Sequence, residues 1–140
     1  MIGIVVVAHE RIASEMKRAV EHVLGEQPLF EAVDVLDSNA VEVVCEQLNS
    51  AVQQCDGGCG VMMFTDMFGS TPCNIALAQM QTEQCEIISG MNLPMLIKAA
   101  SKRKQAMSLK ALAQLTEKAG KQYVCLISEL NAETSEAGHG

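Results

Sequence analysis

Short apolar runs alternate with more polar stretches along this chain. The first run, Ile2 to Ala8, is apolar at nearly every position and rich in β-branched residues. Such a run is typical of a strand buried on both faces, as in a parallel sheet covered by helices. The stretch that follows, Glu10 to Leu24, predicts a helix.

The same alternation continues to residue 128 and indicates the fold class. Further strands are predicted at residues 29–36, 60–64, 84–89 and 122–128. Further helices are predicted at residues 39–54, 72–80, 93–104 and 108–119. Because this alternation is typical of parallel sheets, we expect an α/β fold: one doubly wound, mostly parallel sheet with helices on both faces. We also expect one domain over residues 1–130 and a mobile tail at 131–140.

Composition then narrows the classes of function. With 140 residues, 3% aromatic residues and a net charge of −7, the chain is unlike a nucleic-acid-binding protein. No apolar stretch approaches the roughly 20 residues that cross a bilayer, so we expect a cytoplasmic protein with reduced cysteines. The close pair Cys55 and Cys59 has no second ligand pair, so we expect neither a metal nor a cofactor.

His9 is the first candidate for chemistry. It follows the first predicted strand directly, at the edge where α/β sheets collect ligands. Asp66 follows the third predicted strand, and neighbouring strands would place both side chains together. A carboxylate that accepts a hydrogen bond from one imidazole nitrogen leaves the other nitrogen free as a nucleophile. A surface histidine and a solvated turn residue are the alternative interpretations.

The turn at residues 69–72, Gly-Ser-Thr-Pro, adds a candidate anion site. Thr71 suits a helix N-cap and Pro72 the first helical position, so backbone N–H groups would face the same crevice as His9. This combination suggests a phosphoryl group. A hydrolytic triad is disfavoured because Ser70 lies outside a nucleophile-elbow pattern, and a nucleotide kinase because the sequence has no P-loop.

Three stretches together resemble the mannose-family enzyme IIA of the bacterial phosphoenolpyruvate:sugar phosphotransferase system. They are the strand that ends in His9, Asp-Met-Phe-Gly-Ser-Thr-Pro-Cys-Asn at 66–74, and Ser-Gly-Met-Asn-Leu-Pro-Met at 89–95. The resemblance covers about residues 1 to 130. It implies that His9 accepts a phosphoryl group from the histidine-containing phosphocarrier protein and passes it to a IIB component.

The resemblance also implies roles for other residues. Asp66 would orient the imidazole, and donors of Gly69, Ser70 and Thr71 would hold the phosphoryl oxygens. The family is homodimeric with an exchanged last strand, which Gln122 to Ser128 matches here, and it meets the membrane only indirectly, through the permease. A regulatory phospho-signalling module without sugar transport is the alternative, because no IIB domain follows in this chain.

One position departs from the family pattern. Members commonly carry Thr-His-Gly where this chain has Ala8-His9-Glu10. On one interpretation, the lost hydroxyl and the added carboxylate weaken phosphoryl binding through like-charge repulsion. On the other, Glu10 points outward in the first turn of the helix, where its charge is favourable.

A basic cluster and an asparagine complete the candidates. Lys98, Lys102, Arg103 and Lys104 fall late in a predicted helix, as a solvated face or as a docking patch for an acidic partner. Asn92 is predicted to cap the start of that helix, with an amide that is free to face the crevice.

Overall fold

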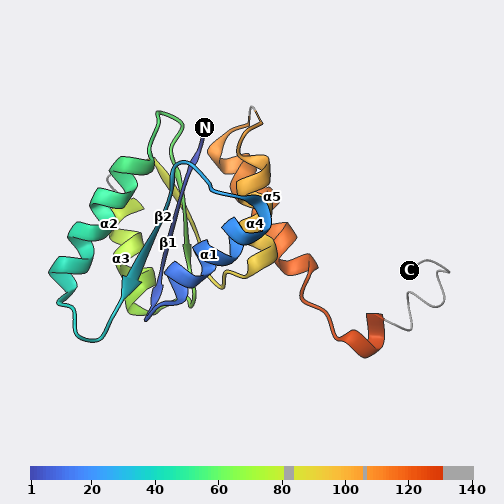
Figure 1. Ribbon diagram of the computed structural model, residues 1–140, viewed down its shortest axis with the longest axis horizontal. Coiled ribbons are helices and arrows are strands. Elements are labelled where there is room, and N and C mark those ends of the chain that lie inside the picture. The colour runs from blue at the N-terminus through green and yellow to red at the C-terminus, as the bar shows by residue number, and fades with distance from the viewer. Residues whose placement is uncertain (81–83, 106, 131–140) are drawn as a thin grey trace.

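The strands of this protein form one parallel sheet. The structure is a computed structural model that describes residues 1–80, 84–105 and 107–130 (Figure 1). Its strands are β1 (Gly3–His9), β2 (Phe30–Val35), β3 (Val61–Thr65) and β4 (Cys85–Ile88). They pair in parallel in the order β2-β1-β3-β4. The expected parallel α/β sheet is confirmed.

Helices cover both faces of this sheet. They are α1 (Ile12–Leu24), α2 (Val41–Cys55), α3 (Thr71–Met80), α4 (Leu93–Lys102) and α5 (Leu109–Gln122). In Figure 1, α2 and α3 lie on one side of the strands and α1, α4 and α5 on the other. No helix of the described ranges is both long and apolar enough to cross a membrane. Because helices lie on both faces of the sheet, the expected doubly wound arrangement is confirmed as well.

β1 is an interior strand between β2 and β3, and its apolar composition follows from that place. Ile4, Val6 and Ala8 pack into the core beneath α1, α4 and α5, and all three are fully buried. Val5 and Val7 are equally buried in the core beneath α2 and α3. Because strand side chains alternate between faces, the next residue in this second series is His9.

The predicted strand at 122–128 is wrong in the structure of this chain. Gln122 ends α5, and residues 127–130 form one turn of helix that lies away from the sheet (Figure 1). A strand needs a neighbouring backbone to satisfy its N–H and C=O groups, and none of the described strands lies beside this segment. Its side chains are therefore exposed by 61–75% at four apolar positions: Tyr123, Val124, Leu126 and Ile127.

Several helix ends differ from the prediction, among them the end of α5, which is Gln122 rather than residue 119. The second helix begins at Val41 rather than at residue 39, after Ala40 as its N-cap. α3 begins at Thr71, one residue earlier than predicted, so Thr71 lies within the helix and does not precede it as an N-cap. α4 ends at Lys102 rather than at residue 104. The predicted tail at 131–140 lies outside the described residues.

The basic cluster at the end of α4 includes one buried member. Arg103 is 1% exposed, and its guanidinium donates hydrogen bonds to the carbonyl oxygens of Ile2, Pro28 and Leu29 and to the side chain of Gln27. Burial lowers the pKa of Arg103. At this position the expected solvated face is wrong: the side chain ties the end of α4 to the starts of β1 and β2.

Candidate active site

The neighbouring strands β1 and β3 bring His9 and Asp66 together. His9 is the last residue of β1, and Asp66 directly follows β3. His9 Nδ1 lies 2.7 Å from Asp66 Oδ2, and the backbone N–H of His9 donates to the same oxygen at 3.0 Å. The carboxylate thus holds both the ring and the backbone of the histidine.

The environment of Asp66 keeps this carboxylate ionised. Its side chain is 15% exposed, against 41% for His9. Burial alone would raise the pKa of Asp66, but the two hydrogen bonds from His9 and the charge on that ring outweigh burial and lower the pKa. Asp66 Oδ1 is buried and has no hydrogen-bond partner among the described residues. Both hydrogen bonds that other described residues donate to this carboxylate come from His9.

This contact selects the tautomer of the histidine. An ionised carboxylate only accepts hydrogen bonds, so a neutral His9 carries its proton on Nδ1. Its Nε2 then has a free lone pair. His9 can act as a nucleophile while Asp66 stabilises the positive charge that develops on the ring.

A cavity of about 230 Å³ lies beside His9. It is lined by the ends of β1 and β2, the loop that follows β2, and the starts of α2 and α3: His9, Val35, Leu36, Asp37, Asn39, Val41, Val44, Thr71 and Ile75. Thr71 is the first residue of α3, where backbone N–H groups have no partner within the helix and the helix dipole is positive. An anion attached to His9 thus has a complementary neighbour.

The other two predicted phosphoryl-binding residues shape the turn instead of lining this cavity. Gly69 has φ +81°, in the left-handed region that favours glycine. The Ser70 hydroxyl donates to the carbonyl of Met67 at 2.6 Å, and the Ser70 carbonyl accepts from Asn74 N at 2.9 Å. Of the predicted set, the structure brings His9, Asp66 and Thr71 together.

Glu10 lies between β1 and α1 and not in the first turn of the helix. α1 begins at Ile12, with Arg11 as its N-cap residue. Glu10 has φ +50°, which is uncommon for any residue other than glycine, and its N–H donates to Val35 O at 3.0 Å. The interpretation of Glu10 as a first-turn residue is therefore wrong, and the backbone shape explains why glycine suits this position.

Asn92 performs the expected capping role and also contacts α5. Its side-chain oxygen accepts from Met95 N at 3.0 Å, and its amide donates to the carbonyl of Gly120 at 3.0 Å. The amide is thus engaged with α5 and not turned toward the crevice.

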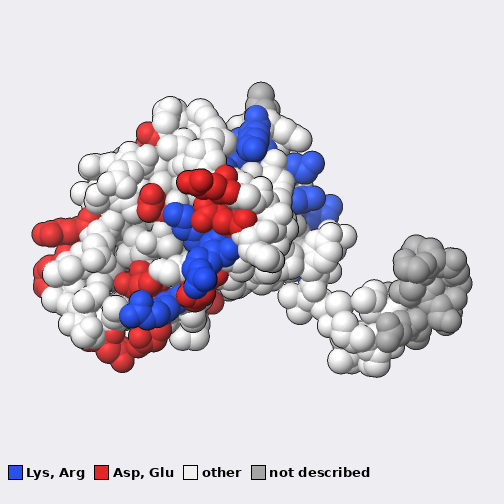
Figure 2. All heavy atoms as spheres, viewed as in Figure 1, with Lys and Arg blue, Asp and Glu red and all other residues white. Residues whose placement is uncertain are grey.

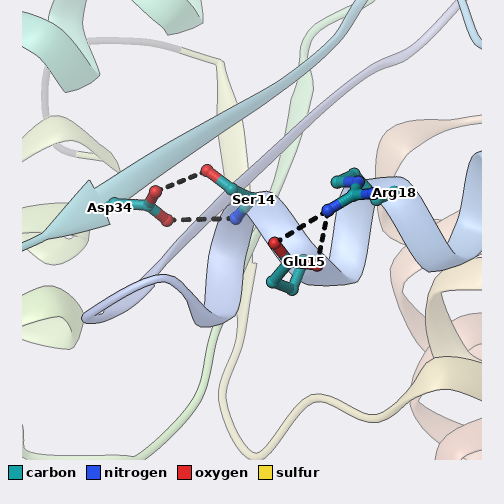
Figure 3. Close-up of polar contacts among 4 residues, drawn as sticks. All are labelled: Ser14, Glu15, Arg18 and Asp34. Atoms are coloured by element: carbon teal, nitrogen blue, oxygen red, sulfur yellow. Dashed lines mark hydrogen bonds and ion pairs between the residues drawn. The ribbon is translucent and has the colours of Figure 1, made fainter.

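Two features near the site escaped the sequence reasoning. Met67 and Phe68, in the loop after β3, are 57% and 81% exposed, although their apolar character was visible in the sequence. Asp34 on β2 accepts two hydrogen bonds from Ser14 on α1 (Figure 3). For Asp34, the available sequence signal was a carboxylate within a mostly apolar strand.

Comparisons with known proteins place this chain among phosphotransferase-system IIA components. Residues 3–117 match the family model EIIA-man, described as PTS system fructose IIA component. The chain is 29% identical over 124 residues to the PTS system mannose-specific EIIAB component of Escherichia coli (strain K12), covering 88% of this chain. It spans only 38% of the length of that relative.

Two further matches are to proteins of nearly the same length as this chain. The PTS system sorbose-specific EIIA component of Lacticaseibacillus casei is 30% identical over 98 residues, which cover 69% of this chain and 70% of that protein. Among solved structures, the phosphotransferase system component EIIA from Streptococcus agalactiae superposes with a TM-score of 0.82 at 23% identity. That superposition covers 92% of this chain and 99% of the other.

Proposed function

This chain belongs to the EIIA-man family, the mannose-family IIA components of the sugar phosphotransferase system, and from that premise we propose that His9 is the residue that carries the phosphoryl group. The observation that supports this most is the 2.7 Å contact between His9 Nδ1 and Asp66. It leaves Nε2 as the free nitrogen of a half-exposed ring beside a cavity.

The proposed reaction moves one phosphoryl group between two imidazoles. His9 Nε2 attacks the phosphorus of the phosphohistidine on the phosphocarrier protein, in line with the bond to the donor nitrogen. The new N–P bond forms as the old one breaks, and the donor ring keeps the released electron pair. Asp66 stabilises the charge on the His9 ring, and catalysis is mainly positioning. A IIB component then takes the group by the same chemistry, and no cofactor enters the scheme.

We assign the phosphoryl oxygens chiefly to Thr71. Thr71 lines the cavity beside His9, where its hydroxyl and the N–H groups at the start of α3 can donate to an anion. Ser70 and Gly69 contribute through the turn that aims this helix start, because the Ser70 hydroxyl is already bonded to Met67. The proposal places the protein in the cytoplasm, where it reaches the membrane only through the permease.

Partner proteins would dock on the apolar rim of the site, formed by Met67, Phe68 and Val41. Val41 lines the cavity beside His9 and is 53% exposed, and Phe68 is the most exposed large apolar residue described. Figure 2 shows acidic side chains gathered over α2, and Asp37 at the cavity adds to them. A donor or acceptor with a basic, partly apolar face fits this rim.

The same premise supports a homodimer in which residues 123–130 cross to a second copy. Their apolar side chains are exposed, and β4 is an edge strand of the described sheet. A cavity of about 340 Å³ lies between β4 and α5, and its lining includes Ser89, whose buried hydroxyl has no partner in the described chain. Sedimentation should show a dimer, and Leu126→Asp should convert it to a monomer; a wild-type monomer contradicts the proposal.

Phosphorylation itself is the direct test. The protein is incubated with phosphoenolpyruvate, enzyme I and the phosphocarrier protein, and its intact mass is then measured. We expect one acid-labile phosphoryl group on the wild type and none on His9→Ala. His22→Ala is the matched control, because His22 lies at the far end of α1 and should leave the label unchanged. A label that persists in His9→Ala, or its absence from the wild type, contradicts the proposal.

A further inference from the structure

The turn that joins β1 to α1 carries His9 and is held in an unfavourable shape. Glu10 follows His9 directly and adopts φ +50°. Residues other than glycine persist in this region only where their surroundings hold them there. The shape of this turn fixes where the His9 backbone leaves the sheet, so the contacts that hold the turn bear on the reacting side chain.

α1 begins without a capping side chain of its own. Arg11 occupies the N-cap position and makes no side-chain cap hydrogen bond in the described structure. A helix start normally uses an N-cap side chain to accept from the N–H of its second or third residue. In α1 the third residue is Ser14, and its N–H donates at 3.0 Å to Oδ1 of Asp34.

Asp34 therefore caps α1 from a neighbouring strand. Its second oxygen, Oδ2, accepts from the Ser14 hydroxyl, so both carboxylate oxygens are engaged with one residue of α1 (Figure 3). The carboxylate also lies at the positive end of the helix dipole, where a negative charge is stabilising. Both contacts pull the first turn of α1 onto the end of β2.

The strand register shows how this contact bears on His9. Asp34 pairs with Ala8, and Val35 pairs with His9. Val35 also accepts the N–H of Glu10 at 3.0 Å and lines the cavity beside His9. Since side chains alternate along a strand, Asp34 faces α1 on the opposite side of the sheet from that cavity. It cannot touch the phosphoryl group and must act through the turn.

We propose that Asp34 is a positioning residue of the phosphoryl-transfer site: it caps α1 across the sheet and so holds the strained His9-Glu10-Arg11 turn. This inference rests on the proposed role of His9. It also assigns the two nearby helix starts to different tasks. Asp34 neutralises the start of α1, and the start of α3 at Thr71 is left for the phosphoryl anion.

The test compares two aspartates with similar local roles. Asp56 also accepts backbone N–H groups, from Gly58 at 2.9 Å and Gly60 at 3.3 Å, but before β3, at the opposite end of the sheet from His9. We expect Asp34→Ala to lower the maximal rate of His9 phosphorylation about tenfold, with KM for the phosphocarrier protein nearly unchanged. Asp34→Asn keeps an acceptor for Ser14 N and should restore most of the rate. Asp56→Ala should leave the rate unchanged.

A second comparison isolates the strained turn. In a Glu10→Gly background the turn no longer needs to be held, so Asp34→Ala should reduce the rate by much less than in the wild type. Equal losses in the two backgrounds, or an equal loss in Asp56→Ala, would overturn the proposal. If Asp34→Ala does not fold, Ser14→Ala serves instead, because it removes only the hydroxyl contact and should give a smaller loss of the same kind.

Hydrogen exchange separates this inference from the function itself. Protection of the Glu10 amide, which donates to Val35, should fall about tenfold in Asp34→Ala and stay constant in Asp56→Ala. Unchanged protection overturns the inference even where His9 is phosphorylated. A fall in protection without phosphorylation of the wild type overturns the proposed function and leaves the cap in place.

Discussion

The two ends of the sheet use charged residues in opposite ways. At the end where β1 and β2 begin, Arg103 is 1% exposed, and its two terminal nitrogens donate four hydrogen bonds. At the end where β1 and β3 finish, His9 is 41% exposed and shares one carboxylate oxygen of Asp66 between its ring and its backbone. The first arrangement fixes chain segments in place, whereas the second leaves a ring nitrogen available for reaction.

Removing the charge of Asp66 should give the largest effect on activity. Asp66→Asn keeps the shape of the side chain but loses the carboxylate that stabilises a positive ring on His9. We expect the initial rate of His9 phosphorylation to fall about a hundredfold. Rapid-quench labelling from the phosphorylated donor measures this rate. A rate within about threefold of wild type would show that Asp66 only positions the ring.

Removing Arg103 should instead affect stability and spare the chemistry. Arg103→Met leaves the carbonyl oxygens of Ile2 and Pro28 buried without these donors, at an expected cost of about 3 kcal/mol in the free energy of unfolding. Urea unfolding measures this cost. Lys104→Met, the exposed neighbour, is the control and should change stability by less than about 0.5 kcal/mol.

The rate of His9 phosphorylation per folded molecule should match wild type in both of these variants. A lower rate in Arg103→Met would contradict the division of roles between the two ends of the sheet. A loss confined to Lys104→Met would instead point to the basic cluster as a docking patch.

The two ends should also differ in their response to pH. At the end where β1 begins, the Cys55 thiol donates to the carbonyl of Ile4. Burial, with a smaller contribution from the charge of Glu31, raises the pKa of Cys55 from 9.0 to about 11. The thiol is thus neutral in the fold while it ionises in the unfolded chain, so stability is full below pH 9 and declines between pH 9 and 11. The expected loss over this range is about 2 kcal/mol.

Asp66 responds in the opposite direction. Its pKa is lowered in the fold, so its contribution is present above the ordinary carboxyl pKa of 3.8 and is lost as the pH falls through the folded value. Urea unfolding in the alkaline and acid pH ranges tests both assignments. The alkaline decline in stability should disappear in Cys55→Ala, and the acid decline should be smaller in Asp66→Asn. An alkaline decline that survives in Cys55→Ala would contradict the assignment to this thiol.

The sequence predicts those features of the structure that are caused by residues adjacent in the chain, and it does not predict those that depend on distant segments. The apolar run of β1 and the placement of His9 and Asp66 at strand ends follow from local composition, because burial and strand ends leave their mark on adjacent residues. The capping contact of Asp34 depends on the register between β1 and β2, which no local pattern states. The strand predicted at 122–128 shows the same limit, since a strand propensity is realised only beside another strand.

Arg103 and Glu10 were misread for related reasons. A lysine-rich neighbourhood suggested a solvated arginine, but the long side chain reaches carbonyl groups 74 and 101 residues earlier in the chain. Glu10 suits a helix start by its charge, yet the chain must turn sharply from β1 before α1 begins at Ile12. In both cases tertiary geometry decided what residue type alone did not.

The smallest expected effect addresses Glu10, which follows His9 directly and has a left-handed backbone. Glu10→Gly removes the cost of the left-handed backbone and should stabilise the fold by about 1 kcal/mol, which a shift in urea midpoint measures. It also removes a negative charge next to His9, so the phosphoryl group should transfer to His9 severalfold faster.

Glu10→Gln is the control, because it removes the charge and keeps the strained backbone. If Glu10→Gln raises the rate as much as Glu10→Gly without raising stability, repulsion and backbone shape act separately at this turn. If neither variant raises the rate, the Glu10 side chain lies too far from Nε2 to affect the phosphoryl group.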